Sequence, residues 1–310
     1  MRYCTNLIEM VYRQQGFRAA IGVGSRCVIA QATKLPRFGC IVISHRGYRR
    51  HVDKYFEIYS DEIVNALSCL PVEMKTYEIG LEGHASHLGS FAYPPNYAAG
   101  PMDEGGHREQ KLLEYFVSLD LLDIQPNDVV VDVASEWSIF PEVVRKLKGA
   151  RVYKQDLIYR PGIHGDYIGS SAENMPVPDG FADKLVLHNA FEHFEGMADS
   201  DFILEAWRVL KPGGTLAILP LLVSGRHTVL TDPLVGRRGI VWDEEAQVTE
   251  RLGFNNRFAR FYDATTLRER VLTPGRGFNT TIRHVLNTEE VHSRAYLHFA
   301  LVMQKPMKPS

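Results

Sequence analysis

The sequence predicts an α/β protein with a doubly wound, mostly parallel sheet that helices cover on both faces. Three observations predict this fold. After residue 106, short apolar strands alternate with amphipathic helices, a pattern that implies right-handed crossovers between parallel strands. Proline and glycine at 212–214 end one helix directly before an apolar run. The last two strand-like runs are too close together for a helical crossover, so we expect an antiparallel hairpin at one edge.

Each element of this fold follows from its periodicity. Apolar runs predict strands over 128–134, 151–155, 184–188, 215–219, 279–286 and 295–304. Helical spacing of apolar residues predicts helices over 107–122, 140–147 and 200–210. In the last helix, Ile203, Trp207 and Leu210 share one apolar face, which indicates that this face packs on the sheet.

The chain before residue 107 has a different texture. Helical spacing covers 53–70, and the stretch 89–106 is rich in Gly, Pro and Tyr, which indicates a linker. Three short apolar runs broken by Gly, Pro and Ser look like strands: 21–23, 27–30 and 40–43. We therefore expect three parts: an N-terminal α+β extension over 1–106, a main domain over 107–304 and a flexible tail over 305–310.

The composition is that of an ordinary soluble globular protein. Of 310 residues, 45% are hydrophobic and 23% are charged, and the formal net charge is -2. This balance argues against a disordered or collagen-like chain and against a protein that coats nucleic acid, so no nucleic-acid partner is expected.

The cysteine spacing and the apolar runs predict a cytoplasmic protein without a membrane span. The cysteines at positions 4, 27, 40 and 69 form no CxxC pair, which favours reduced thiols. No apolar run approaches the roughly 20 residues that cross a bilayer. Near the N-terminus, Glu9 interrupts the apolar stretch that a signal peptide needs.

Polar side chains gather where three of the predicted parallel strands end, which is where open α/β sheets bind their ligands. Asp132 lies at the end of the first strand, and Asp156 closes the second, where a carboxylate can accept hydrogen bonds from ribose hydroxyls. His188 and Asn189 leave a third strand, with His193 shortly after them.

These motifs together resemble a class I S-adenosylmethionine-dependent methyltransferase of the broad type 11 kind. The resemblance covers roughly residues 107–220. Its most specific parts are AENMPVPDG at 172–180, Asp183, HN at 188–189, EH at 192–193, Glu205 and RVLKPGG at 208–214. The resemblance implies a seven-stranded sheet with S-adenosylmethionine as the cofactor.

The resemblance also implies roles for individual residues. Asp132 matches an acid near the methionine amino group, and Asp156 matches the acid that holds the ribose. Ser171 matches a residue at the adenine edge, and Asn189 one on the methyl and sulfonium side. The cofactor-binding candidates are Asp132, Ala134, Ser135, Glu136, Ser138, Asp156, Leu157, Ser171, Ala172, His188 and Asn189.

The first motif departs from the family pattern. Its three glycine positions hold Ala134, Glu136 and Ser138. Glycine allows close backbone approach and positive φ, so we expect the path of this turn to differ at Glu136. Ser171 replaces the acid expected beside adenine, although its hydroxyl can still bond an amino group.

The expected reaction is methyl transfer to a small acceptor, by family analogy a hydroxyl of a sugar, a glycan or a secondary metabolite. A hydroxyl acceptor needs a general base. We expect His193 to be this base, at a helix start whose dipole lowers a histidine's pKa, and His188 to be a positioning group. Residues 1–106 would cover the site and bind the acceptor. No metal is expected, and the oligomeric state stays open, with a homodimer as one option.

Two other classes of protein stay open. The lost glycines favour a non-catalytic binding protein on the same fold. A nicotinamide oxidoreductase is disfavoured because no GxGxxG turn follows the first strand.

Several candidate residues also have a structural explanation. Asp132 could cap a turn, Asp156 could be a loop carboxylate, His188 could be a buried histidine, and His193 could cap a helix. The basic stretch 34–54 could bind phosphate or form a solvated face. The two histidines of the motif GHASH at 83–87 could bind a metal, but two histidines are far from a complete site.

Overall fold

The computed structural model describes residues 58–94, 97 and 107–307. The expected strands at 21–23, 27–30 and 40–43, the basic stretch 34–54 and the first three cysteines lie outside the described residues. No helix in the described part of the chain is long and apolar enough to cross a membrane.

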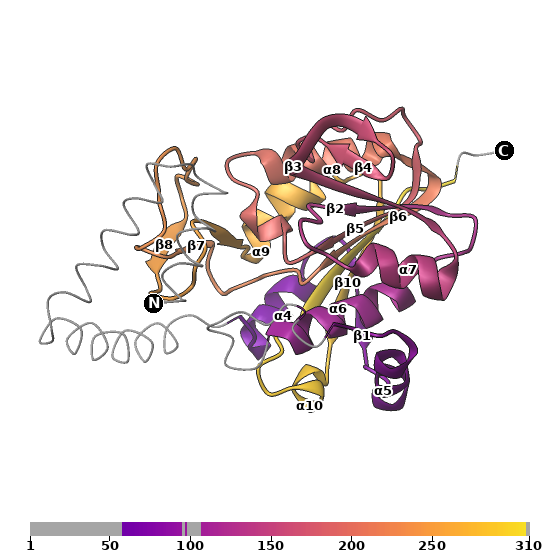
Figure 1. Cartoon of the computed structure of the whole chain (residues 1–310). Helices are drawn as coiled ribbons and strands as arrows, with labels where there is room; N and C mark the ends of the chain where they lie inside the picture. Colours follow the sequence, from indigo (N-terminus) through magenta and orange to yellow (C-terminus); the bar gives the residue numbers. More distant parts are fainter. Residues whose placement is uncertain (1–57, 95–96, 98–106, 308–310) are drawn as a thin grey trace, which may run out of the picture.

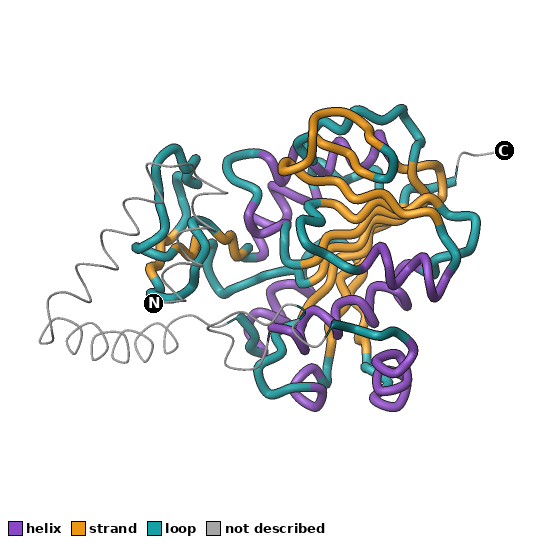
Figure 2. The backbone as a smooth tube through the Cα atoms, viewed as in Figure 1, coloured by secondary structure: helices purple, strands orange, loops and turns teal. Residues whose placement is uncertain are grey.

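An eight-stranded sheet forms the centre of the molecule, in the order β1-β10-β11-β6-β5-β2-β3-β4 (Figure 2). Its strands are β1 Glu73–Tyr77, β2 Val129–Val133, β3 Arg151–His164, β4 Tyr167–Gly169, β5 Ala182–His188, β6 Leu210–Leu219, β10 Asn279–Val285 and β11 Phe299–Gln304. Only β11 runs antiparallel to its neighbours β10 and β6. The doubly wound, mostly parallel fold class is therefore confirmed.

The strand at the edge of this sheet differs from the expectation. The seven strands from β2 onward form the expected sheet, and β1 adds an eighth by pairing parallel with β10. The antiparallel pair of β10 and β11 therefore lies one strand inside the edge. The sequence analysis missed β1 because its burial pattern has no continuous apolar run.

The helices confirm the predicted periodicity after residue 106. They are α4 Asp61–Ser68, α5 Leu81–Ser90, α6 His107–Leu122, α7 Phe140–Lys148, α8 Ala198–Val209, α9 Ala264–Leu267 and α10 Thr288–Val291, with a short 3-10 turn η1 Phe191–His193 and a π turn η2 Arg268–Leu272. Helices α6 and α7 lie on one face of the sheet, and α8 and α9 lie on the other (Figure 1).

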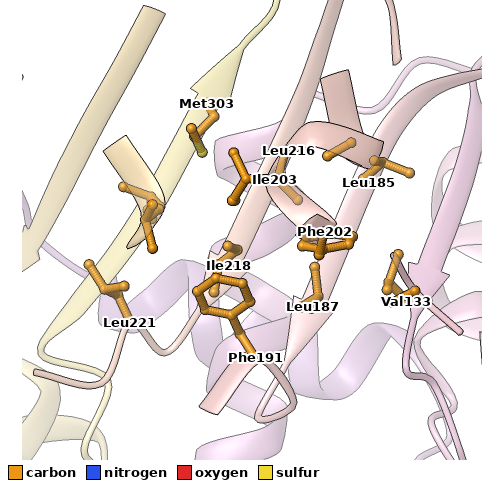
Figure 3. Close-up of a cluster of buried hydrophobic side chains, with 14 of the residues drawn as sticks. Val133, Leu185, Leu187, Phe191, Phe202, Ile203, Leu216, Ile218, Leu221 and Met303 are labelled. Carbon is orange, nitrogen blue, oxygen red and sulfur yellow. The ribbon is translucent and has the colours of Figure 1, made fainter. Parts of the chain in front are cut away.

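Two buried clusters hold these layers together because successive residues of a strand point to opposite faces. In β2, Val131 and Val133 pack toward α8, whereas Val130 packs toward α6 and α7. Figure 3 shows Phe202 and Ile203 of α8 among the side chains of the sheet. The predicted apolar face is therefore confirmed at Ile203 but not at Trp207, which is 39% exposed, and Leu210 belongs to β6 because the helix ends at Val209.

The described part of the first 106 residues shares this core. Ile63 and Leu67 of α4 belong to the same buried cluster as Ile203, and Ile79 belongs to the cluster under α6. This packing and the pairing of β1 join residues 58–90 to the sheet. The described part of the extension therefore contributes to the fold of the main domain.

A second, three-stranded sheet lies between β6 and β10 in the sequence. Its strands are β7 Thr228–Thr231, β8 Gln247–Glu250 and β9 Ala259–Phe261, in the order β8-β7-β9. It lies to one side of the main sheet (Figure 1). Its strands are only three or four residues long, too short for a periodicity signal, and the sequence analysis did not predict them.

Buried ion pairs connect this small sheet to α8. The Arg260 side chain of β9 is fully buried; its Nη1 lies 2.9 Å from Asp199 Oδ2 and its Nε 2.6 Å from Asp243 Oδ2. Arg260 also donates to the carbonyls of Phe194 and Gly196. Burial opposes ionisation of Asp243, but hydrogen bonds from Arg260 and His227 outweigh burial and lower its pKa.

We predict that Arg260→Met lowers the free energy of unfolding by about 3–5 kcal/mol, because buried Asp243 loses the arginine that pairs with it most closely and buried Asp199 keeps only Arg270. The control is Arg257→Met, which breaks a half-exposed pair with Glu195 and should cost about 1 kcal/mol or less. Urea unfolding measures both. Equal losses in the two variants would contradict a dominant role for the buried pairs.

Candidate functional site

The candidate residues converge at the carboxyl ends of three adjacent strands. Strand β2 lies between β5 and β3, and all three run parallel. Asp132 lies in β2, Asp156 in β3 and His188 at the end of β5. The structure therefore brings these three predicted residues to the same edge of the sheet.

The turn after β2 has an unusual backbone. Ala134 has φ of 51° and Glu136 has φ of 37°, which is the left-handed region that glycine favours. Such conformations cost about 1–3 kcal/mol each in non-glycine residues. Two of the three positions at which the family pattern has glycine, Ala134 and Glu136, therefore have the conformation that glycine favours, whereas Ser138 is not among the residues with positive φ.

Strand β3 supplies partners for the backbone of this turn. Ala134 N donates to Gln155 Oε1 (3.1 Å), and Ser135 N donates to the Gln155 carbonyl (2.9 Å). Glu136 N donates to Asp156 Oδ2 (2.9 Å). Consecutive N–H groups of the turn are thus satisfied by one strand, which offsets the cost of the strained torsions.

Two backbone N–H groups hold the carboxylate of Asp156 in place. Its Oδ2 accepts from Glu136 N, and its Oδ1 accepts from Ile158 N at 3.0 Å. Leu157 is 75% exposed, so an apolar surface lies directly beside this carboxylate. Burial, followed by the nearby charge of Asp156, raises the pKa of Glu136.

The other candidates near this edge have simpler surroundings. Ser138 Oγ lies 3.1 Å from the hydroxyl of Tyr115 and accepts from the N–H of Phe140. Ser171 is half-buried and Ala172 is buried, just after β4, which pairs with β3.

His188 is enclosed by protein. Its Nε2 lies 3.0 Å from Ser118 Oγ, and its Nδ1 lies 3.6 Å from Asp132 Oδ1. The rings of Tyr115 and Phe140 contact it edge-on. Burial lowers the pKa of His188, against the opposing effect of Asp132. This environment suits a neutral histidine, whose Nδ1 faces Asp132 without a hydrogen bond among the described residues.

His193 lies differently from the expectation. It is the last residue of the η1 turn, and α8 begins only at Ala198, so the expected helix start is absent at this residue. Its Nδ1 is 2.6 Å from the Phe258 carbonyl. A carbonyl only accepts, so Nδ1 carries the proton in the neutral ring and Nε2 keeps its lone pair. Nε2 lies 3.8 Å from Glu192 Oε1, and the side chain is 36% exposed.

A buried carboxylate on α6 is part of the same region. Glu114 Oε1 accepts from Gln110 and from Asn189, whereas Oε2 accepts no hydrogen bond in the described part of the chain. The nearest cation is Lys111, 3.6 Å from Oε2, and it also donates to the His188 carbonyl. Burial raises the pKa of Glu114 to about 7, against the opposing charge of Lys111.

Sequence reasoning missed Glu114, although one signal was present. Gln110 and Glu114 are spaced i, i+4 in a helix that is otherwise buried on most sides. A polar pair at that spacing within an apolar helix indicates a buried hydrogen bond. Asn189, which has φ of 48°, connects this pair to Tyr296, whose hydroxyl donates to Asn189 Oδ1 at 2.9 Å.

The two histidines of the GHASH motif have a structural role. His84 and His87 are both buried and contact the ring of Phe116. His87 Nε2 lies 2.7 Å from the hydroxyl of Tyr93. Among the described residues, no group of His, Cys, Asp and Glu could hold a metal ion.

Residues 139–218 match the family described as "Methyltransferase domain". They include the strands β3 to β5 and nearly all of β6, and they begin directly after Ser138 of the first motif. Over these residues the chain is similar to a methyltransferase domain, as the sequence resemblance implied. Its sheet has the seven strands expected for this class plus β1.

Solved structures of similar fold come from several bacteria. The 1,6-didemethyltoxoflavin-N1-methyltransferase of Burkholderia thailandensis is 14% identical, with 66% of this chain and 80% of that chain covered and a TM-score of 0.45. A possible exported protein of Bordetella parapertussis is 18% identical, with 70% and 75% covered and a TM-score of 0.42. The YcgJ protein of Bacillus subtilis is 16% identical, with 40% and 54% covered and a TM-score of 0.31. No curated protein matches the chain.

The residues around these strand ends fit S-adenosylmethionine, the cofactor that the sequence resemblance implies. The cofactor carries a sulfonium and an ammonium group. Asp132 Oδ2, Glu114 Oε2 and Glu192 Oε2 are buried oxygens with no hydrogen-bond partner in the described residues. Carboxylate oxygens of this kind are complementary to a cation.

We predict that Glu114 makes stability depend on pH. Its folded pKa of about 7 lies above the usual 4.5, so the folded state binds more protons between these values and stability falls as pH rises. Relative to wild type, Glu114→Gln should gain about 3 kcal/mol in free energy of unfolding from pH 4.5 to above 7.

Urea unfolding across this pH range measures the difference. The control is Glu109→Gln, which changes a partly exposed carboxylate on the same helix and should give a curve parallel to wild type. A parallel curve for Glu114→Gln as well would contradict the raised pKa.

Proposed function

We propose that the protein transfers a methyl group from S-adenosylmethionine to a hydroxyl of a small acceptor such as a sugar, a glycan or a secondary metabolite. The observation that carries the proposal is the fixed Asp156 carboxylate beside the left-handed turn after β2. This arrangement offers a ribose acceptor, a backbone turn and an apolar side chain, Leu157, at one edge of the sheet.

Each candidate then has a role toward the cofactor. Asp156 would accept hydrogen bonds from the ribose, and Leu157 would contact the adenine face. Asp132 would lie near the methionine amino group, with His188 Nδ1 3.6 Å from its Oδ1. The remaining candidates would line the methionine, the adenine edge and the methyl side: Ala134, Ser135, Glu136, Ser138, Ser171, Ala172 and Asn189.

When bound, the cofactor supplies an electrophilic methyl group whose thioether leaves without an acid. The protein's contribution is alignment, exclusion of water and removal of the acceptor proton. His193 Nε2 is suited to take that proton, because the Phe258 carbonyl fixes the tautomer that leaves this nitrogen free. The Glu192 carboxylate, 3.8 Å from Nε2, would stabilise the imidazolium that forms.

The acceptor would bind on the side of η1. Glu192 is buried next to His193, and Tyr296 reaches Asn189 from the loop before β11. We further propose that residues 1–106 cover this side and contribute to acceptor binding. The packing of α4 against the sheet supports a location close to the domain.

We predict that Asp156→Ala weakens S-adenosylhomocysteine binding by roughly 1.5–3 kcal/mol, the range for hydrogen bonds to a charged group. Titration calorimetry on the full chain measures the affinity. The control is Asp166→Ala, which removes a carboxylate paired with Arg145 next to the same strand and should change little. A folded Asp156→Ala variant with unchanged affinity would remove Asp156 from the site. A wild-type protein that does not bind S-adenosylhomocysteine would instead favour the non-catalytic alternative.

We predict that His193→Gln lowers turnover by roughly 10²–10⁴-fold with little change in cofactor affinity, because it removes the general base. The measurement is S-adenosylhomocysteine formed with a hydroxyl acceptor obtained from a screen of small polyols and phenols. His188→Gln should act through Asp132 and weaken cofactor binding more than turnover. The reverse pattern would exchange the two roles, and no effect in either variant would exclude both histidines as the base.

A further inference from the structure

Tyr159 lies on the part of β3 that continues past the candidate carboxylate Asp156. We propose that Tyr159 is a positioning residue whose hydroxyl holds the turn after β2 in the shape that glycine would otherwise provide. The inference deepens the proposed function, on which it rests, because this turn is the segment that would contact the cofactor's methionine.

The fold brings Tyr159 to the turn through an extension of β3. This strand runs to His164, and its last residues fold back beside β4, with Ile163 opposite Ile168. The fold-back requires Gly169 in β4, because a Cβ there would overlap the Arg160 carbonyl oxygen. Because these backbones lie so close together, the backbone position of Tyr159, the residue before Arg160, is also fixed.

The Tyr159 hydroxyl makes two contacts with the turn. It donates to the Glu136 carbonyl at 2.8 Å and lies 3.2 Å from Ser135 Oγ. Burial raises the pKa of Tyr159 to about 12, so the hydroxyl keeps its proton and remains a donor. The other contacts from β3 bind N–H groups of the turn, and Tyr159 binds the carbonyl of Glu136.

The turn after β2 needs this contact because it has no glycine at two positions with left-handed torsions. Ala134 and Glu136 both hold left-handed torsions without glycine, and a side chain makes that conformation unfavourable. Glu136 is hydrogen-bonded on both sides: its N–H donates to Asp156, and its carbonyl accepts from Tyr159. These two bonds keep the peptide in the strained orientation. Restoring glycine at this position should make the Tyr159 contact less important.

This coupling between Tyr159 and Glu136 can be tested with S-adenosylhomocysteine as the probe. Calorimetry on the full chain compares wild type, Tyr159→Phe, Glu136→Gly and the double variant. We expect Tyr159→Phe to weaken binding about 3- to 10-fold, the scale of one hydrogen bond. In the Glu136→Gly background the same change should cost about twofold or less, because glycine adopts the left-handed torsion unaided.

A matched control separates this effect from a general loss of structure where the end of β3 folds back beside β4. Tyr167→Phe removes a hydroxyl from β4, where the Tyr167 ring contacts the Tyr159 ring at 5.0 Å, and it should leave affinity unchanged. Urea unfolding confirms that each variant is folded. If Tyr159→Phe loses stability, the comparison of the two backgrounds still reports the coupling, because a purely structural role would not depend on Glu136.

Three results would overturn the proposal: unchanged affinity in Tyr159→Phe, an equal loss in both backgrounds, or tighter binding. The last would show that Tyr159 competes with the cofactor for the Glu136 carbonyl. In all three, wild type still binds S-adenosylhomocysteine, so only the role of Tyr159 fails. Absence of binding by wild type would overturn the proposed function and this inference together.

Discussion

The geometry of the strand-end site depends on the hydrogen bonds that β3 accepts from the turn after β2. Two residues of this turn have left-handed torsions although neither is glycine. Such a turn persists only where its surroundings determine it, and β3 provides a partner for each of three consecutive N–H groups. The same strand carries Asp156, so the contacts that hold the turn also fix the candidate ribose acceptor.

A second set of contacts fixes the opposite side of the site. Arg260 donates to the carbonyls of Phe194 and Gly196, directly after the η1 turn that carries His193. The Phe258 carbonyl lies two residues before Arg260, in the segment between β6 and β10, and it sets the tautomer of His193. The small three-stranded sheet, which lies between β6 and β10 in the sequence, therefore also contributes to the candidate site. It holds the candidate base through hydrogen bonds from Arg260 and to Phe258, and buried ion pairs fix Arg260 itself.

Much of the fold could be predicted from the sequence because burial imposes periodicity. The helix over 107–122 and the strands around Asp132 and His188 follow directly from apolar spacing. Strand β1 is partly exposed and gives no such signal. The same holds for the three short strands of the small sheet, and only tertiary contacts define these four strands.

The candidate site was predictable to a similar extent. Motif positions located Asp132, Asp156 and His188, which the sheet brings to one edge. The surroundings of His193 were not predictable, since its partner Phe258 is 65 residues away in the sequence. The left-handed torsions of Ala134 and Glu136 were not predictable either. The absence of glycine from a motif does not reveal whether other contacts replace its effect.

The most direct test of this account is a crystal structure of the full chain with S-adenosylhomocysteine. The account predicts the ligand across the ends of β2, β3 and β5, with both ribose hydroxyls on the Asp156 carboxylate and the turn at 134–136 in its present left-handed conformation. A ligand bound elsewhere, or a site that remains empty at saturating concentration, would contradict it.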